Sequence, residues 1–240
     1  QEGSSKAIIP NVDEDLNQMI LINTAGGITS GDKFSTCIEL DNSFLCTSSQ
    51  AAEKIYKGLN NPGNINVEIN VKNNSCIYWL PQEMILFNNC NLKRNININL
   101  SKCSNLLMCE SIIFGRTSMK EKFTNGLYSD FWKISKNGKL VHVEASNTDG
   151  YEPSIFSKVA TFNNNCALNT IIGVGKEILN KAEIIKKNLK ENSMSNSEIS
   201  IWDEKLIIRT ISIDNYHLRF AVKNILSYFF KKNIPKIWSM

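Results

Sequence analysis

The sequence predicts a mainly β fold in a single domain over residues 1–240, β-rich over 1–172 and helix–strand–helix over 173–240. The first observation behind this prediction is a series of short apolar segments, separated by turn residues, through the first 170 positions. The second is a change to helical spacing of the apolar residues after Gly173. The third is that no long linker divides the 240 residues, of which 42% are hydrophobic and 21% charged. Such a chain can bury a sizeable core.

The β-rich part consists of segments with alternating or continuous apolar residues, bounded by pairs such as Asn-Gly, Asp-Asn and Asn-Asn. The pair Asn137-Gly138 lies between two of them and predicts a hairpin. Many short strands at near-even spacing are typical of a sandwich, a barrel or a solenoid-like stack of sheets, and the periodicity favours none of the three. The expected strands are residues 19–23, 35–40, 65–71, 76–80, 96–100, 106–114, 127–134 and 140–145.

The last third is expected to contain two amphipathic helices with a strand at 206–212 between them. A polar break at 191–200 separates the first helix from this strand. Asp214 can cap the second helix, and Lys231 and Lys232 lie at its C-terminal end, where the helix dipole favours positive charge. The apolar residues at helical spacing are Val174, Ile178, Ala182, Ile185 and Leu189 in the first helix, and Leu218, Val222, Ile225, Leu226 and Phe229 in the second.

The net charge is +4, with lysines concentrated after Lys176. Glu177, Glu183 and Glu191 interrupt this run, which favours a solvent-exposed helix face over a nucleic-acid site. No segment approaches the roughly twenty apolar residues of a membrane span. We therefore expect neither a nucleic acid nor a membrane among the partners.

The seven cysteines are scattered along the chain without a Cys-x-x-Cys pair, and only His142 and His217 could complement them in a metal site. Most of them lie in apolar segments, where a free cysteine packs as a small hydrophobic residue. The sequence therefore predicts reduced thiols, a cytoplasmic location and no stable metal site.

The glycine-rich segment at Gly26-Gly27 and Gly31 matches neither a phosphate-binding loop nor a dinucleotide-binding motif, because it leads into a strand-like segment. Tight turns that need positive φ explain these glycines better. No nucleophile motif and no metalloprotease motif occurs elsewhere in the sequence. We expect no catalytic residues and no enzymatic activity.

Several uncommon phrases follow one another in a fixed order. In the first half they are N-T-A-G-G-I-T-S-G-D at 23–32, S-S-Q-A-A-E-K-I-Y-K at 48–57, L-P-Q-E-M-I-L-F at 80–87 and F-G-R-x-x-x-x-E-x-F at 114–123. The C-terminal third adds W-D-E-K-L-I-I-R at 202–209, then Tyr216, Leu218 and Arg219, then I-P-K-I-W at 234–238. Together these phrases resemble the UreD/UreH family of urease accessory proteins over nearly the whole chain.

The resemblance implies a mostly β protein whose strands are layered into a helical stack of sheets, with two helices. It also implies three partners: the urease apoprotein, a UreF-type bridging protein and a UreG-type GTPase, on which GTP is hydrolysed while nickel is delivered to urease. Nickel would pass only transiently, and no cofactor would be stably bound. The chain departs from the family pattern at Lys57, where Arg is common, and at Lys120, where Gly is usual.

Two alternatives come from other classes of protein. One is a β-rich scaffolding or binding module without a role in metal transfer. The other, weaker, is a thiol-based metal-storage or redox protein, which would need the cysteines to cluster in space.

Asp32, Glu110 and Glu144 match acidic positions of the family and are the first candidates for a nickel conduit. Carboxylates in otherwise apolar strands are oxygen ligands weak enough to release a divalent ion. Asp32 directly follows the glycine turn. Glu83 follows Pro81 at an expected strand end, where it is a further conduit candidate or simply a solvated side chain.

Two of these carboxylates have structural alternatives. Glu110 is the only charged residue in 106–114, and a salt bridge to Arg116 on the same strand face would satisfy it as well as a polar path would. Glu144 shares a strand face with His142, and a hydrogen bond between the two is favoured over a shared metal ion, although His142 stays a conduit candidate.

The remaining candidates belong to the family phrases and concern partner binding. Gln50, Lys54 and Tyr56 alternate along one side of a strand, or line up on a short helix. A polar row of this kind is usually solvent-exposed, whereas in a UreD-like protein it faces a partner or a polar interior. Arg116 and Glu121 come from the phrase at 114–123.

Overall fold

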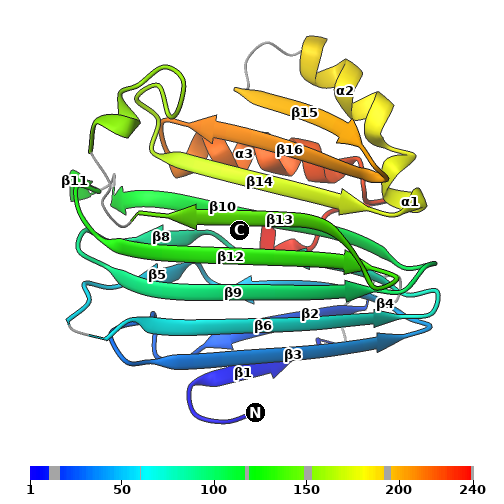
Figure 1. The fold of residues 1–240 in the computed structure, drawn as a ribbon, viewed down its shortest axis with the longest axis horizontal. Coiled ribbons are helices and arrows are strands. Elements are labelled where there is room, and N and C mark those ends of the chain that lie inside the picture. Colours follow the sequence, from blue (N-terminus) through cyan, green and yellow to red (C-terminus); the bar gives the residue numbers. More distant parts are fainter. Residues whose placement is uncertain (11–16, 60, 117–118, 149–152, 192–195, 239–240) are drawn as a thin grey trace.

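The computed structural model shows two β-sheets stacked face to face, with helices covering the outer face of the larger sheet (Figure 1). It describes residues 1–10, 17–59, 61–116, 119–148, 153–191 and 196–238. The larger sheet has eleven strands and the smaller sheet has five. No helix in these ranges is long and apolar enough to cross a bilayer.

Successive long strands alternate between the two sheets, so the chain winds as a solenoid. Strands that come from successive turns of this winding are parallel neighbours within each sheet. The larger sheet contains in this way β2 (Gln18–Asn23), β4 (Phe44–Gln50), β7 (Cys76–Leu80) and β10 (Asn105–Arg116). The smaller sheet contains β3 (Lys33–Asp41), β6 (Gly63–Lys72), β9 (Asn91–Leu100) and β12 (Leu127–Lys136). The layered helical stack of sheets is therefore confirmed.

Antiparallel strands complete both sheets. β13 (Lys139–Asn147) pairs with β12 through the turn at Asn137-Gly138, which confirms the expected hairpin. β1 (Ser5–Ile8) pairs with β2 at one edge of the larger sheet, and β14 (Ala167–Val174), β16 (Lys205–Ser212) and β15 (Ser197–Trp202) extend the other. The short elements are β5 (Glu53–Ile55), β8 (Met84–Leu86), β11 (Glu121–Lys122), η2 (Pro153–Phe156) and η3 (Lys236–Trp238).

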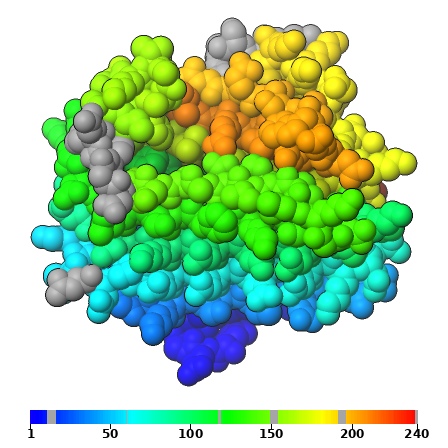
Figure 2. All heavy atoms as spheres, in the orientation of Figure 1, coloured from blue at the N-terminus to red at the C-terminus, as the bar shows by residue number. Residues whose placement is uncertain are grey.

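The core between the sheets follows from strict alternation along the strands. In β9, for example, Ile96 and Ile98 are buried toward the larger sheet, while Asn95 and Asn99 point outward. The outward asparagines form rows across the smaller sheet, where Asn95 donates to Asn66 and Asn99 to Asn70. The Ile/Asn pattern of these strands is thus explained by one buried and one solvated face, and Figure 2 shows that solvated face as a continuous surface.

Three helices cover the opposite face of the larger sheet: α1 (Lys176–Leu179), α2 (Ala182–Glu191) and α3 (Asn215–Ser227). Asp214 caps α3 by accepting a hydrogen bond from the His217 N–H at 2.9 Å, as expected. The two helical stretches expected in the last third are confirmed, although the first is divided by a turn into α1 and α2, and Val174 belongs to β14. The Lys181 N–H bonds three residues back to Ile178, a tight turn that ends α1.

The sequence prediction missed three long strands, β4, β14 and β15. β14 is buried on both faces, so it shows no alternation. β15 lies inside the polar stretch that was expected to be a break, and most of its residues are exposed. β15 is stabilised by pairing with β16, and the hydrophobic periodicity of its own sequence does not indicate such pairing.

We expect Asp214→Ala to lower the free energy of unfolding by about 1 kcal/mol, because the cap of α3 is lost. Burial raises the pKa of Asp214, but the hydrogen bonds and charge of His217 outweigh this and hold it below its usual value. The cap therefore stabilises the fold above the unfolded-state pKa, and its contribution is lost as the pH falls through the folded-state pKa. Urea unfolding at pH 7 and in acid measures the difference, which should shrink in acid. Glu198→Ala, at an exposed position of β15, is the matched control.

Candidate functional site

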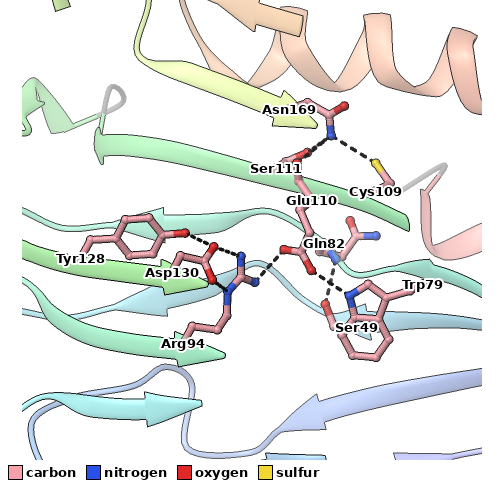
Figure 3. A network of polar contacts seen from close by, with 10 residues as sticks. All are labelled: Ser49, Trp79, Gln82, Arg94, Cys109, Glu110, Ser111, Tyr128, Asp130 and Asn169. Carbon is pink, nitrogen blue, oxygen red and sulfur yellow. Dashed lines mark hydrogen bonds and ion pairs between the residues drawn. The ribbon is translucent and has the colours of Figure 1, made fainter. Parts of the chain in front are cut away.

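A buried ion cluster lies between the two sheets (Figure 3). We call it the Arg94 cluster; its members are Arg94, Glu110, Asp130, Tyr128 and Trp79, each at most 5% exposed. Arg94 donates two hydrogen bonds to Asp130, from Nε to Oδ1 at 2.9 Å and from Nη2 to Oδ2 at 2.6 Å. It donates a third to Glu110, from Nη1 to Oε2 at 2.7 Å. The Trp79 indole donates to Glu110 Oε1 at 2.8 Å, and the Tyr128 hydroxyl donates to Asp130 Oδ2 at 2.6 Å.

The electrostatics of the cluster follow from its burial. Burial by itself lowers the pKa of Arg94, but the Asp130 and Glu110 carboxylates outweigh this and raise it well above the usual value. Burial, followed by the charge of Asp130, raises the pKa of Tyr128. The guanidinium therefore stays charged, and one positive charge against two carboxylates leaves an excess of one negative charge between the sheets.

The backbone of Glu110 is held from the helix side of the larger sheet. Asn169 of β14 is fully buried, and its Nδ2 donates to the Glu110 carbonyl at 3.0 Å and to the Ser111 hydroxyl at 2.9 Å. The side chains of Ser111 and Asn169 point away from that of Glu110, as alternation along β10 requires (Figure 3). The position of the carboxylate is thus fixed from both faces of the sheet.

A cavity of about 110 Å³ adjoins the cluster between the sheets. Its volume is enough for several water molecules. Arg94, Trp79 and Glu110 form part of its wall, while apolar residues such as Phe34 and Val67 form much of the rest. The remaining polar residues in the wall are Ser5, Asn23, Thr36, Ser49, Gln50, Glu53 and Gln82.

Glu53 is a cavity residue that the sequence analysis missed. It begins β5, within the phrase at 48–57, and its Oε1 accepts a hydrogen bond from Asn23 Nδ2 at 3.0 Å. Burial raises its pKa, and the Asn23 hydrogen bond only partly opposes that. The cavity therefore contains two carboxylates from different strands, Glu53 and Glu110. A signal did exist, because Glu53 is the only acid in that phrase.

Glu83 does not join these two carboxylates. It forms an ion pair at 2.7 Å with Arg219 of α3, which also donates to Gln82 Oε1 at 2.6 Å and to the Ile237 carbonyl at 3.1 Å. The Arg219 guanidinium lies 5.2 Å from the Trp238 ring. Glu83 is 4% exposed, so it is not the solvated side chain that the strand-end position allowed. It links the larger sheet to its helices.

Glu144 and His142 lie together on β13, near β16. Both Glu144 oxygens accept from Arg209 Nη2, at 2.6 and 2.9 Å. The His142 Nε2 lies 3.4 Å from Glu144 Oε2, an ion-pair distance at which the geometry makes no hydrogen bond. The expected contact between His142 and Glu144 is therefore present, at ion-pair distance and not as a well-formed hydrogen bond, and Arg209 is the main partner of Glu144. Burial raises the pKa of Glu144, but its contacts with His142 and Arg209 outweigh this and lower it overall.

A polar row connects Glu144 with the Arg94 cluster. Glu110, Thr170 and Arg209 are register partners on β10, β14 and β16. Arg209 Nη1 also donates to the Thr170 hydroxyl at 3.4 Å. The row thus runs along the larger sheet from Glu110 to Arg209, whose side chain reaches Glu144 on the smaller sheet.

The expected pair between Glu110 and Arg116 is wrong. The two residues are six positions apart on one strand, which at ~3.3 Å per residue separates their Cα atoms by about 20 Å. Arg116 instead pairs with Glu121 across the β10–β11 hairpin and lies 4.3 Å from the Phe87 ring centre. The hydrogen bond from Arg116 is the main reason that the pKa of Glu121 is lowered. This pair organises a hairpin close to Phe87.

The other candidates lie in the turns and at the surface. Asp32 is half-buried, and its Oδ2 accepts from the Thr29 N–H at 2.9 Å, so it closes its own turn and is not in the cavity wall. Gly26 and Gly31 have φ values of 77° and 81°, which confirms the expected turns. Lys120, where the family usually has Gly, also has positive φ, at 58°.

Gln50, Lys54 and Tyr56 do not form one continuous row. Gln50 ends β4, whereas Lys54 lies in β5 and Tyr56 directly after it, on either side of the buried Ile55. All three are exposed, and Gln50 also borders the cavity. The Tyr56 hydroxyl donates to the Gly26 carbonyl at 3.2 Å, which joins the first two family phrases in space.

All seven cysteines are free thiols. Burial raises the pKa of Cys46, Cys76 and Cys90 to about 12 and raises that of Cys109 as well. Within the described ranges, no three His, Cys, Asp or Glu side chains are placed to hold a metal ion together. The arrangement therefore does not favour a thiol-based metal store. That the chain holds no stable metal stays a prediction.

Comparisons with known proteins give one consistent result. A family model described as UreD urease accessory protein matches residues 1–239. A urease accessory protein UreD of Rhizobium leguminosarum bv. viciae is 30% identical over 245 residues, covering 100% of this chain and 88% of the relative. Proteins of the same description from Agrobacterium fabrum and Rhodopseudomonas palustris are each 29% identical, over 244 and 241 residues, and are covered to 84% and 85% of their length.

We expect Arg94→Met to lower the free energy of unfolding by about 3–5 kcal/mol, because it leaves Glu110 and Asp130 buried without a counter-charge. Lys93→Met, the next residue on the same strand but exposed on the outer face, is the matched control and should change stability by less than about 0.5 kcal/mol. Urea unfolding followed by circular dichroism measures both. Equal, small effects would mean that the cluster does not stabilise the fold.

The thiols give a separate prediction. In the native protein at pH 8, iodoacetamide should modify the exposed Cys37 and Cys103 first, because only a thiolate reacts and the buried thiols stay protonated. Peptide mass mapping locates the modified residues, and the same reaction in denaturant should reach all seven. Rapid native labelling of Cys46 or Cys76 would contradict the burial described above.

Proposed function

This chain belongs to the family of UreD urease accessory proteins, and from this premise we propose that it passes nickel ions toward the urease active site through the space between its two sheets. In this proposal it works in the cytoplasm, where it binds the urease apoprotein and recruits a UreF-type bridging protein and a UreG-type GTPase. GTP is hydrolysed on that GTPase. This subunit supplies a path for the ion and a surface for assembly.

The observation that carries the proposed path is the cavity between the sheets, whose wall contains two carboxylates. Glu53 and Glu110 border it, together with the amide and hydroxyl oxygens of Asn23, Ser49 and Gln50. Oxygen ligands hold a borderline divalent ion such as nickel less firmly than thiolates or imidazoles do. Ligands that release the ion suit transfer better than storage.

The Arg94 cluster supports attraction of a cation, despite its guanidinium. Its charges sum to minus one, and the low dielectric between the sheets strengthens their effect. Each Glu110 oxygen accepts one hydrogen bond, from Trp79 or from Arg94, so each keeps a second lone pair. Arg94 meanwhile stays anchored to Asp130 through two further bonds. An ion that reaches Glu110 can therefore compete with a single hydrogen bond and leave the rest of the cluster intact.

The polar row through Thr170 and Arg209 offers a continuation from Glu110 to Glu144. In this part of the proposal the ion leaves between β13 and β16, where the Arg209 side chain is 45% exposed. The buried Nε1 of Trp132 and Nε2 of His142 make no hydrogen bond to the described residues, which is consistent with water along this route.

The alternative, a β-rich scaffold without metal transfer, has one observation in its favour. Glu110, Glu83 and Glu144 are each paired with an arginine, which is what purely structural carboxylates would do. Glu53 is different, because its side-chain partner among the described residues is the neutral amide of Asn23. Glu53 is therefore the residue that separates the two functions.

We expect Glu53→Gln to lower nickel-dependent activation of urease at least about tenfold, because a charged ligand is replaced by a neutral one of the same shape. Unfolding by urea and co-purification with urease and the bridging protein should be unchanged. Glu68→Gln, on the exposed outer face of β6, is the matched control. Wild-type activation by the Glu53 variant, with intact complexes, would favour the scaffold. Loss of the complexes would place Glu53 in assembly instead.

A further inference from the structure

A second hollow, larger than the cavity between the sheets, lies at one end of the molecule. It is a groove of about 850 Å³ between the β12–β13 turn, α1 and the β15–β16 turn, which lie together at the right of Figure 1. Lysines on three different elements surround it: Lys102 in the β9–β10 turn, Lys136 and Lys139 at the β12–β13 turn, and Lys176 at the start of α1. We call it the lysine groove. It shares no residue with the wall of the inter-sheet cavity.

The charge of the lysine groove is not balanced by its own acids. The acids in its wall are Asp203 and Glu204, and Glu204 forms an ion pair with Lys136 at 3.6 Å. Lys102, Lys139 and Lys176 are exposed and form no ion pair with another described residue. Four lysines against two carboxylates leave an excess of two positive charges in a single hollow. Such a surface attracts a negatively charged partner.

A buried lysine beside the groove is an independent observation. Lys205 is only 7% exposed, and its Nζ donates to the carbonyl of Val141, which lies in the groove wall, at 2.5 Å. It also lies 4.7 Å from the Trp202 ring centre. Among the described residues it has no carboxylate partner, although a buried charge is usually paired. Its charge adds to that of the groove and makes the excess three.

We propose that the lysine groove binds an extended acidic segment of a partner protein. A compact anion would need donors that converge on one point, whereas these lysines rim the hollow on three separate elements. The wall also contains Leu140, which is 60% exposed, and Leu179, so apolar side chains of a peptide find a surface between the charges. A single-stranded nucleic acid is less suited, because the described wall contains no aromatic side chain on which bases could stack.

This inference does not depend on the nickel path. The groove and the cavity are lined by different residues, so binding at the groove and transfer through the cavity can be tested separately. The groove would act by speeding encounter and fixing the orientation of the partner, which is what complementary charge at an interface mainly does.

The test uses the full chain and a defined probe, a fluorescein-labelled decapeptide of alternating Glu and Leu, with fluorescence anisotropy as the readout. Lys102→Glu combined with Lys139→Glu should weaken binding about tenfold or more, because attraction is replaced by repulsion at two sites. The control is Lys93→Glu together with Lys122→Glu, which makes the same charge change at exposed positions outside the groove and should weaken binding less than about twofold. Circular dichroism checks that both double variants are folded.

Three results would overturn the proposal. The first is no binding of the Glu–Leu decapeptide at low salt. The second is an equal loss of binding in the groove variant and in the control, which would indicate only general attraction to a basic protein. The third is tighter binding of a single-stranded oligonucleotide, lost in the groove variant alone, which would make the groove a nucleic-acid site. Nickel activation of urease, measured in parallel on purified components, tests the proposed function separately.

Discussion

The structure depends above all on the contact of Arg94 with Asp130 beside it and with Glu110 on the facing sheet. Charges this deeply buried are tolerated only when they are paired and fully hydrogen-bonded. The pairing requires β9, β10 and β12 to hold one relative register, since a shift by one residue would turn each charged side chain to the opposite face. The hydrogen bond from Asn169 to the Glu110 backbone likewise requires a fixed register between β14 and β10. The cluster therefore couples the winding of the solenoid to the position of one carboxylate.

The same contact reconciles a stable interior with the path that we propose for an ion. Arg94 uses two of its three bonds on Asp130 and one on Glu110, so the two carboxylates are not held equally. Asp130, which also accepts from Tyr128, is the structural half of the cluster. Glu110 faces the cavity and is the half that can exchange a partner. A buried charge need not be wholly structural or wholly functional when its neighbours divide these tasks.

Much of the fold could be predicted from the sequence, because alternation along β6, β9 and β12 reports a half-buried sheet directly. Strands such as β14 and β15 could not, since one is buried on both faces and the other is held by its neighbour. The site was found only in part. Glu110 stood out because it is a charged residue on the apolar face of an alternating strand. Arg94 lies in the same way between Leu92 and Ile96, and Asp130 between Tyr128 and Trp132, so the same rule would have found the cluster. Its pairing remained hidden, because contacts between facing sheets depend on topology.

The surfaces of the sandwich limit where partners can be recognised. The outer face of the smaller sheet carries rows of asparagines, whose amides are uncharged and partly bonded to one another. The outer face of the larger sheet is covered by α1, α2 and α3. The lysine groove lies instead at one end of the solenoid, beside the turns that carry Lys102 and Lys139 and the start of α1 at Lys176. Turns tolerate such residues because they do not have to match a register. In the two proposals made above, the strands therefore keep the interior path in place, while the residues around the lysine groove select the partner.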